Sequence, residues 1–157
     1  MEGGIQTYDW INSNGKPRNA WVISAGATHA DDARKEGVAM ILLSKAKNMF
    51  QQARNKTKGQ GWKRISGRLM YVDMLYPGIG IVRTFVLYLP PCTSQANMTL
   101  RQNAWTLLKE AYTDAKNDPA IKATQWRGDW NSRIDIKAIQ YRKKSAVNTA
   151  ATTRCLS

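Results

Sequence analysis

Short apolar runs separated by turn-forming residues predict the strands of this chain. Residues 37–43 are apolar throughout after their glycine, which is typical of a strand buried on both faces. Between residues 68–75 and 81–89, Pro77 and Gly78 favour a turn, so these two strands are expected to form a hairpin. The expected strands are 20–25, 37–43, 68–75, 81–89 and 121–126.

Capping residues and apolar residues at helical spacing predict the helices. Thr99 and Gln102 form a capping-box pattern that opens a helix, and Asp118 with Pro119 ends it near residue 117. One or two further helical turns are expected where apolar residues recur at helical spacing, at Ala46, Met49, Phe50 and Ala53. Strands that alternate with helices indicate a mixed α/β domain, and ligands of such folds gather at the carboxyl ends of strands.

Both ends of the chain lack these patterns. Residues 1–19 are polar and rich in turn formers, so we expect a flexible N-terminal segment. Residues 137–157 are basic and then rich in Ala and Thr, which predicts a flexible tail. One domain is therefore expected over residues 20–136. Residues 54–64 read as a basic loop.

The charge is strongly unbalanced, with 24 Lys and Arg against 11 Asp and Glu and a net charge of +13. Such a surface attracts polyanions, and nucleic acid is the commonest polyanion inside cells. A merely basic soluble domain is the alternative.

No run of 18 apolar residues and no basic amphipathic helix stands out, so no membrane partner is expected. Cys92 and Cys155 suggest neither a zinc site nor a disulfide framework, and they favour a nuclear or cytoplasmic location within the cell.

The best candidate for chemistry is the turn Gly128-Asp129-Trp130-Asn131, which follows the last expected strand. The carboxylate of Asp129 can orient or deprotonate a water molecule. The side-chain amide of Asn131 can donate to a phosphate oxygen and compensate developing charge. An ordinary Asx-type turn is the alternative explanation for this tetrapeptide.

Four segments in order resemble endonuclease/exonuclease/phosphatase domains, with the endonucleases of non-LTR retroelements as the nearest group. They are residues 35–44, residues 62–73, residues 82–91 with the ending Tyr88-Leu89-Pro90-Pro91, and the turn at 128–131, which follows the helix from Thr99. The resemblance spans roughly residues 20–135. It implies a partial α/β sandwich of that type and Mg²⁺-assisted hydrolysis of phosphodiesters in nucleic acid, with DNA favoured over RNA.

The resemblance also implies roles for single residues. Tyr88 matches a tyrosine that touches the scissile phosphate, and Asp129 and Asn131 match the catalytic Asp-x-Asn pair. Arg101 matches a phosphate-binding arginine at the start of the helix, and Glu2 is a weak match to the metal-binding glutamate. The alternatives are a buried strand tyrosine for Tyr88 and a solvated helix arginine for Arg101. We expect Tyr88, Asp129 and Asn131 to converge at the carboxyl ends of two neighbouring strands, an edge called the rim below.

The chain departs from the family pattern in two places. It has no asparagine on a first strand, and neither a Ser-Asp-His element nor any histidine follows Asn131, because His29 is the only histidine. We therefore expect a truncated domain that binds nucleic acid with little or no turnover. A non-catalytic basic module and a degenerate remnant are the alternatives. Trp62, Trp126 and Trp130 can stack on unpaired bases if they are exposed, and packing in the core is the favoured alternative. The oligomeric state is left open.

Overall fold

Two sheets and two helices form a mixed α/β fold in the computed structural model, which describes residues 4–26 and 37–131. The three-stranded sheet is antiparallel, in the order β1 (Gly4–Ile11), β2 (Pro17–Gly26), β3 (Gly37–Leu42). The four-stranded sheet runs in the order β4 (Trp62–Ser66), β5 (Leu69–Tyr76), β6 (Gly80–Tyr88), β7 (Ile121–Asp129). The helices are α1 (Ser44–Thr57) and α2 (Gln95–Asn117).

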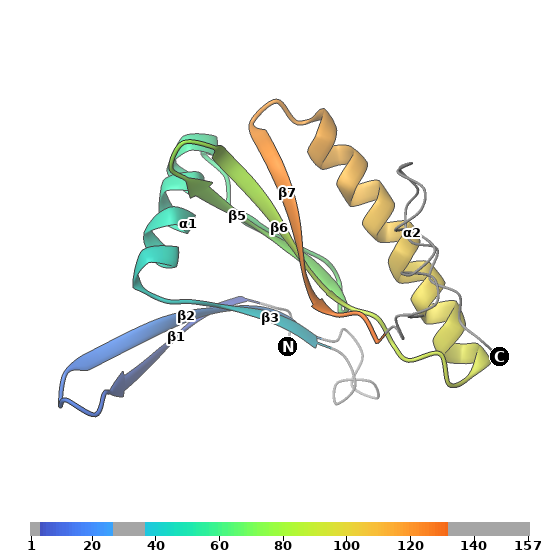
Figure 1. The fold of residues 1–157 in the computed structure, drawn as a ribbon, viewed down its shortest axis with the longest axis horizontal. Coiled ribbons are helices and arrows are strands. Elements are labelled where there is room, and N and C mark those ends of the chain that lie inside the picture. Colours follow the sequence, from blue (N-terminus) through green and yellow to red (C-terminus); the bar gives the residue numbers. More distant parts are fainter. Residues whose placement is uncertain (1–3, 27–36, 132–157) are drawn as a thin grey trace, which may run out of the picture.

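The four-stranded sheet is the middle layer of the molecule (Figure 1). On one face, side chains of β5 and β6 pack against α1 and the three-stranded sheet, in a cluster that includes Ile23, Leu42, Phe50, Val72 and Val86. On the other face, α2 covers a second cluster that includes Leu69, Phe85, Leu87, Ala104 and Leu108. Because both faces are buried, β5 and β6 are almost continuously apolar.

Helix α2 connects β6 to its parallel neighbour β7. Its N-cap is Ser94, whose hydroxyl oxygen accepts from the backbone N–H of Asn97 at 3.2 Å. The helix therefore begins several residues before the Thr99–Gln102 pattern, because a serine side chain already satisfies a first-turn donor there. Its end is confirmed, since α2 stops at Asn117, just before Asp118 and Pro119.

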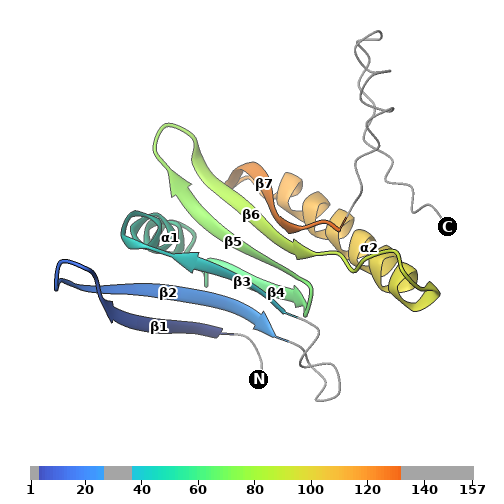
Figure 2. The same cartoon turned by 60° about the horizontal axis from the view of Figure 1, so that its bottom comes forward.

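The expectation of a flexible N-terminal segment is wrong for the residues from Gly4 onward. All eight residues of β1 pair with β2 in continuous antiparallel register. Asn12 closes the hairpin, because its side-chain oxygen accepts from the backbone N–H groups of Asn14 (3.1 Å) and Lys16 (2.9 Å). Gly15 supplies a positive φ of 72° at the same turn. Figure 2 shows β1 at the outer edge of its sheet.

Two further boundaries differ from the expected ones. Helix α1 has 14 residues rather than one or two turns, and it buries Phe50 and Ala53 before Lys58 ends it in the left-handed conformation (φ 53°). The expected basic loop at 54–64 contains the end of α1 and the start of β4.

Three further expectations concern the cysteines, the two chain ends and membrane-spanning helices. Cys92 is disulfide-bonded, although the cysteine pattern suggested no disulfide framework. Glu2, His29, Cys155 and the expected tail at 137–157 lie outside the described residues. Among the described residues, no helix is long and apolar enough to cross a membrane.

Candidate functional site

Tyr88 and Asp129 lie side by side at the carboxyl ends of two parallel strands. They are register partners in the β6–β7 pair, so their side chains leave the same face of the sheet. The backbone N–H of Leu89 donates to the carbonyl oxygen of Asp129 at 2.9 Å and extends the pairing by one residue. Tyr88 is half-buried and Asp129 is exposed. The expected convergence of the two residues on one rim is confirmed.

Gly128 makes this arrangement possible. It lies opposite Leu87 with a φ of 135°, and a Cβ built on it would overlap the carbonyl oxygen of Leu87. Only glycine tolerates both the backbone conformation and this close approach. The glycine of the Gly-Asp-x-Asn turn thus sets how near β7 comes to β6.

Asn131 completes the turn through two hydrogen bonds. Its backbone N–H donates to Oδ1 of Asp129 at 2.9 Å, which is the Asx-type turn considered for the sequence. Its side-chain Nδ2 donates to the carbonyl oxygen of Leu89 at 2.9 Å. Asn131 also adopts a positive φ of 40°, which asparagine tolerates better than most residues. Asn131 therefore lies at the rim with Asp129, with its amide nitrogen held by the main chain of the β6 end.

Arg101 lies beneath the rim rather than on the surface of α2. Its relative exposure is 4%, and its Nη1 donates to the carbonyl oxygens of Pro90 (3.1 Å) and Trp130 (3.0 Å). The expected alternative of a solvated helix arginine is therefore wrong. Burial lowers the pKa of Arg101 from its usual value. The guanidinium ties α2 to the segments that follow β6 and β7.

Arg68 is a rim residue that the sequence did not single out. It lies in the tight β4–β5 connection, and its carbonyl oxygen accepts from the backbone N–H of Tyr88 at 2.9 Å. The guanidinium carbon of Arg68 is 5.5 Å from the centre of the Tyr88 ring, within the range of a cation–π interaction. Arg127, two residues before Asp129 on β7, is exposed. Cationic side chains therefore accompany the rim tyrosine and aspartate.

The described part of the chain does not form a metal site. No group of three or more His, Cys, Asp or Glu side chains is close enough to hold a metal ion among residues 4–26 and 37–131. Mg²⁺ in proteins is usually held by one or two carboxylates together with substrate phosphates. Asp129 offers one carboxylate at this rim, and Glu2 lies outside the described residues. Asp129 can therefore share a magnesium ion only together with substrate phosphates, and the described residues do not hold a resident ion by themselves.

The tryptophans considered for base stacking are packed against the core. Trp62 adjoins the cluster on the α1 side, and Trp126 and Trp130 adjoin the cluster under α2. The ring centre of Trp126 is 5.1 Å from that of Phe85, and Trp130 is 5.7 Å from Trp105. The core alternative for these three side chains is confirmed.

A buried ion pair lies between α2 and the four-stranded sheet, away from the rim. Nε and Nη2 of Arg83 on β6 donate to the two carboxylate oxygens of Asp73 on β5, each at 2.8 Å. The guanidinium carbon is 3.8 Å from the centre of the Tyr71 ring. Arg83 and Tyr71 line a groove of about 390 Å³, with Glu110 and Asp114 of α2 on its other wall. Sequence reasoning missed this pair, because only the register of the β5–β6 hairpin places the two residues opposite each other.

In comparisons with families of known proteins, with characterised proteins and with solved structures, the chain matches none of them.

Proposed function

We propose that the rim at the carboxyl ends of β6 and β7 is the phosphate-facing edge of an endonuclease/exonuclease/phosphatase-like domain. In this proposal the domain binds nucleic acid and has little or no cleavage activity of its own. The observation that carries the proposal is the pairing of Tyr88 with Asp129 on one face of two parallel strands. The resemblance of the sequence assigns a phosphate contact and a catalytic carboxylate to these same two positions.

The chemistry of the rim supports a phosphate ligand. A tyrosine hydroxyl can donate to a phosphate oxygen, and a nearby arginine attracts the phosphate charge. Arg68 lies against the Tyr88 ring, and Arg127 is exposed on β7. The net charge of +13 adds a long-range attraction that does not depend on nucleotide sequence. We favour DNA over RNA because the resemblance is nearest to retroelement endonucleases.

A non-catalytic basic module is the second candidate, and the net charge alone favours it. Its binding would depend on counterion release and would not depend on the residues of the rim. The two candidates therefore differ in whether Tyr88 and Asp129 contribute to affinity.

Fluorescence anisotropy with a labelled DNA duplex, measured over a series of salt concentrations, tests the proposal. Affinity should fall as salt rises. The variant Tyr88→Phe should weaken binding roughly tenfold or more, because hydrogen bonds to charged groups contribute about 1.5–3 kcal/mol. Tyr112→Phe is the matched control, since Tyr112 lies on α2 against Trp126 rather than at the rim.

Asp129→Asn probes the carboxylate, because an asparagine oxygen can still accept from the backbone N–H of Asn131. Without Mg²⁺, the loss of a negative charge beside phosphate should strengthen binding. Any increase in affinity that Mg²⁺ gives to the wild type should disappear in the variant. Unchanged affinity in both Tyr88→Phe and Asp129→Asn would contradict the rim proposal and favour the basic module.

A further inference from the structure

Among residues 4–26 and 37–131, the exposed aromatic side chains are on the β1–β2 hairpin rather than at the rim. Tyr8 is 52% exposed and Trp10 is 43% exposed. They are two positions apart on β1, so their side chains leave the same face of the strand. Their register partners on β2 are Ala20 and Arg18. The opposite face of β2 contributes Ile23 to the core, so Tyr8 and Trp10 lie on the outer face of the three-stranded sheet.

The Tyr8 ring is held along the strand. Its hydroxyl donates to Oε1 of Gln6 at 2.8 Å, on the same face of β1. Ala20, opposite Tyr8 on β2, is buried, while Tyr8 itself stays half-exposed. An exposed aromatic ring that is fixed in orientation loses little conformational entropy when a flat ligand stacks on it.

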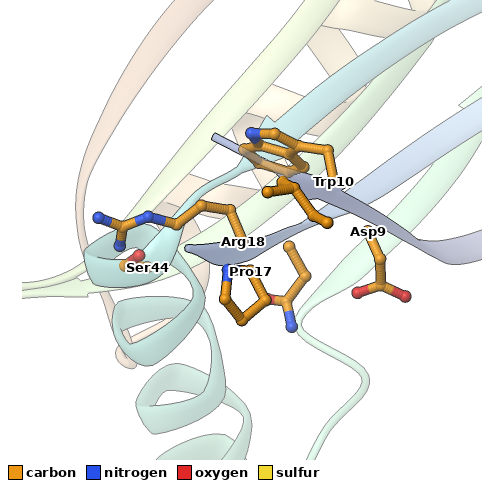
Figure 3. A pocket seen from close by; sticks show the side chains of 7 residues that line it. Asp9, Trp10, Pro17, Arg18 and Ser44 are labelled. Carbon is orange, nitrogen blue, oxygen red and sulfur yellow. The ribbon is translucent and has the colours of Figure 1, made fainter. Parts of the chain in front are cut away.

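Trp10 and Arg18 border an open hollow of about 510 Å³ at the end of the hairpin (Figure 3). Ser44, the first residue of α1, and Asn19 also line it. Nζ of Lys47 is hydrogen-bonded to the backbone and side-chain oxygens of Asn19, whose side chain leaves the opposite face of β2 from that of Arg18. Asp9 is the acidic residue of the lining. Among the residues that line the hollow, Trp10 supplies an exposed indole and Arg18 supplies a positive charge.

The spacing of the Tyr8 and Trp10 rings favours an unpaired strand of nucleic acid over a duplex. Side chains at i and i+2 of a strand are about 6.6–6.8 Å apart, since each residue advances about 3.3–3.4 Å. Stacked bases of a duplex follow one another every 3.4 Å or so and present no free ring face. Bases of an unpaired strand can separate and stack singly on aromatic side chains.

We propose that the outer face of the β1–β2 hairpin binds an unpaired segment of nucleic acid, with two bases stacked on Tyr8 and Trp10. Arg18, the register partner of Trp10 on β2, contacts a phosphate of the same segment. The inference rests on the proposed function in one respect, namely that nucleic acid is the partner. It adds a second contact surface and a preference for unpaired over duplex strands.

The test compares three probes: a labelled oligothymidylate, an abasic oligomer of the same length, and a duplex of the same length. Wild type should bind the oligothymidylate more tightly than the abasic oligomer, because only the former has bases to stack. Tyr8→Ala and Trp10→Ala should each weaken oligothymidylate binding roughly 5- to 150-fold. Neither variant should change binding of the abasic oligomer. Tyr8→Phe and Trp10→Phe keep a ring and should retain most of the affinity, which separates lost stacking from damage to the hairpin.

Arg18→Gln tests the phosphate contact. It should weaken oligothymidylate binding and reduce the slope of log affinity against log salt by about 1. Lys109→Gln is the matched control, since Lys109 is exposed on α2, on the other side of the four-stranded sheet.

The outcomes separate this inference from the function on which it rests. If wild type binds none of the three probes, the proposed function fails and the inference fails with it. If wild type binds but the alanine variants bind oligothymidylate normally, only the inference is overturned. A dimer of the wild type, seen by light scattering and lost in Tyr8→Ala and Trp10→Ala, would show that a second copy covers these rings and would also overturn it.

Discussion

Gly128 lies directly opposite Leu87 in the parallel β6–β7 pair, and a Cβ at position 128 would overlap the Leu87 carbonyl oxygen. We therefore expect Gly128→Ala to lower the free energy of unfolding by about 1–3 kcal/mol from backbone strain alone, with the clash adding to this loss. Gly78→Ala is the matched control, because Gly78 also has a positive φ but has nothing within 4 Å of its Cβ position. Urea unfolding compares the two. Equal losses would mean that the contact with Leu87 adds nothing.

Substitution of Arg101 tests whether this residue holds the backbone at the rim or binds a phosphate ligand. Its Nη1 donates to the carbonyl oxygens of Pro90 and Trp130 in a buried setting, so Arg101→Met should lower the free energy of unfolding by about 1.5–3 kcal/mol. Arg127→Met, at an exposed position on β7, should change it by no more than about 0.5 kcal/mol. A stable Arg101→Met protein that has lost only its DNA affinity would instead identify Arg101 as a phosphate ligand.

The Asp73–Arg83 pair should contribute strongly when only one partner is removed. Asp73→Ala leaves the Arg83 guanidinium buried without its carboxylate, so we expect a loss of about 3–5 kcal/mol in unfolding free energy. The double variant Asp73→Leu with Arg83→Met removes both charges and should lose less than Asp73→Ala alone. A double-mutant cycle measured by urea unfolding checks this. Additive losses would show that the two side chains are not coupled.

Tyr71 should make stability depend on alkaline pH. Burial raises the pKa of Tyr71 above its ordinary value of 10.0, although the positive charge of Arg83 acts in the opposite direction. The folded state therefore favours the neutral phenol. The resulting stabilisation is fully present below pH 10 and is lost as the pH rises through the higher pKa of the folded state.

Unfolding free energies measured on both sides of pH 10 for wild type and Tyr71→Phe test this dependence. Wild type should lose stability relative to the variant as the pH rises, because the unfolded state ionises first. The difference between the two proteins at neutral pH gives the baseline. A difference that stays constant across the range would contradict the prediction.

Much of the fold was predictable because its central strands are buried on both faces. Apolar runs bounded by turn residues identified β5 and β6, and the breaker residues placed the end of α2. The run at residues 37–43 also forms a strand, but the expected burial on both faces is wrong, because β3 is an edge strand that exposes Ile41. Strand β1 was missed because nearly all its side chains are exposed, so no buried face imposes an apolar pattern on it. Its pairing depends on β2 and on the Asn12 turn, which local composition does not reveal.

The candidate site was predictable only where its residues are close in sequence. The turn from Gly128 to Asn131 was found as a motif, and the parallel β6–β7 pair brings Tyr88 to it. Arg68 was missed because only the β4–β5 connection brings it to the Tyr88 ring. Arg101 was expected to be either exposed or phosphate-binding, because its position on α2 does not show that two backbone carbonyls lie within reach.

The residues at the rim also allow a prediction about cleavage activity. We expect negligible Mg²⁺-dependent nicking of supercoiled plasmid by wild type, because Asp129 alone offers one carboxylate and no histidine follows Asn131 to assist the chemistry. Asp129→Ala should be equally inactive, while salt-sensitive binding persists in both proteins. Nicking by wild type that disappears in Asp129→Ala would contradict this expectation. It would mean that Glu2, His29 or a partner chain completes a catalytic site around Asp129, and the rim would then have to be treated as part of an active nuclease.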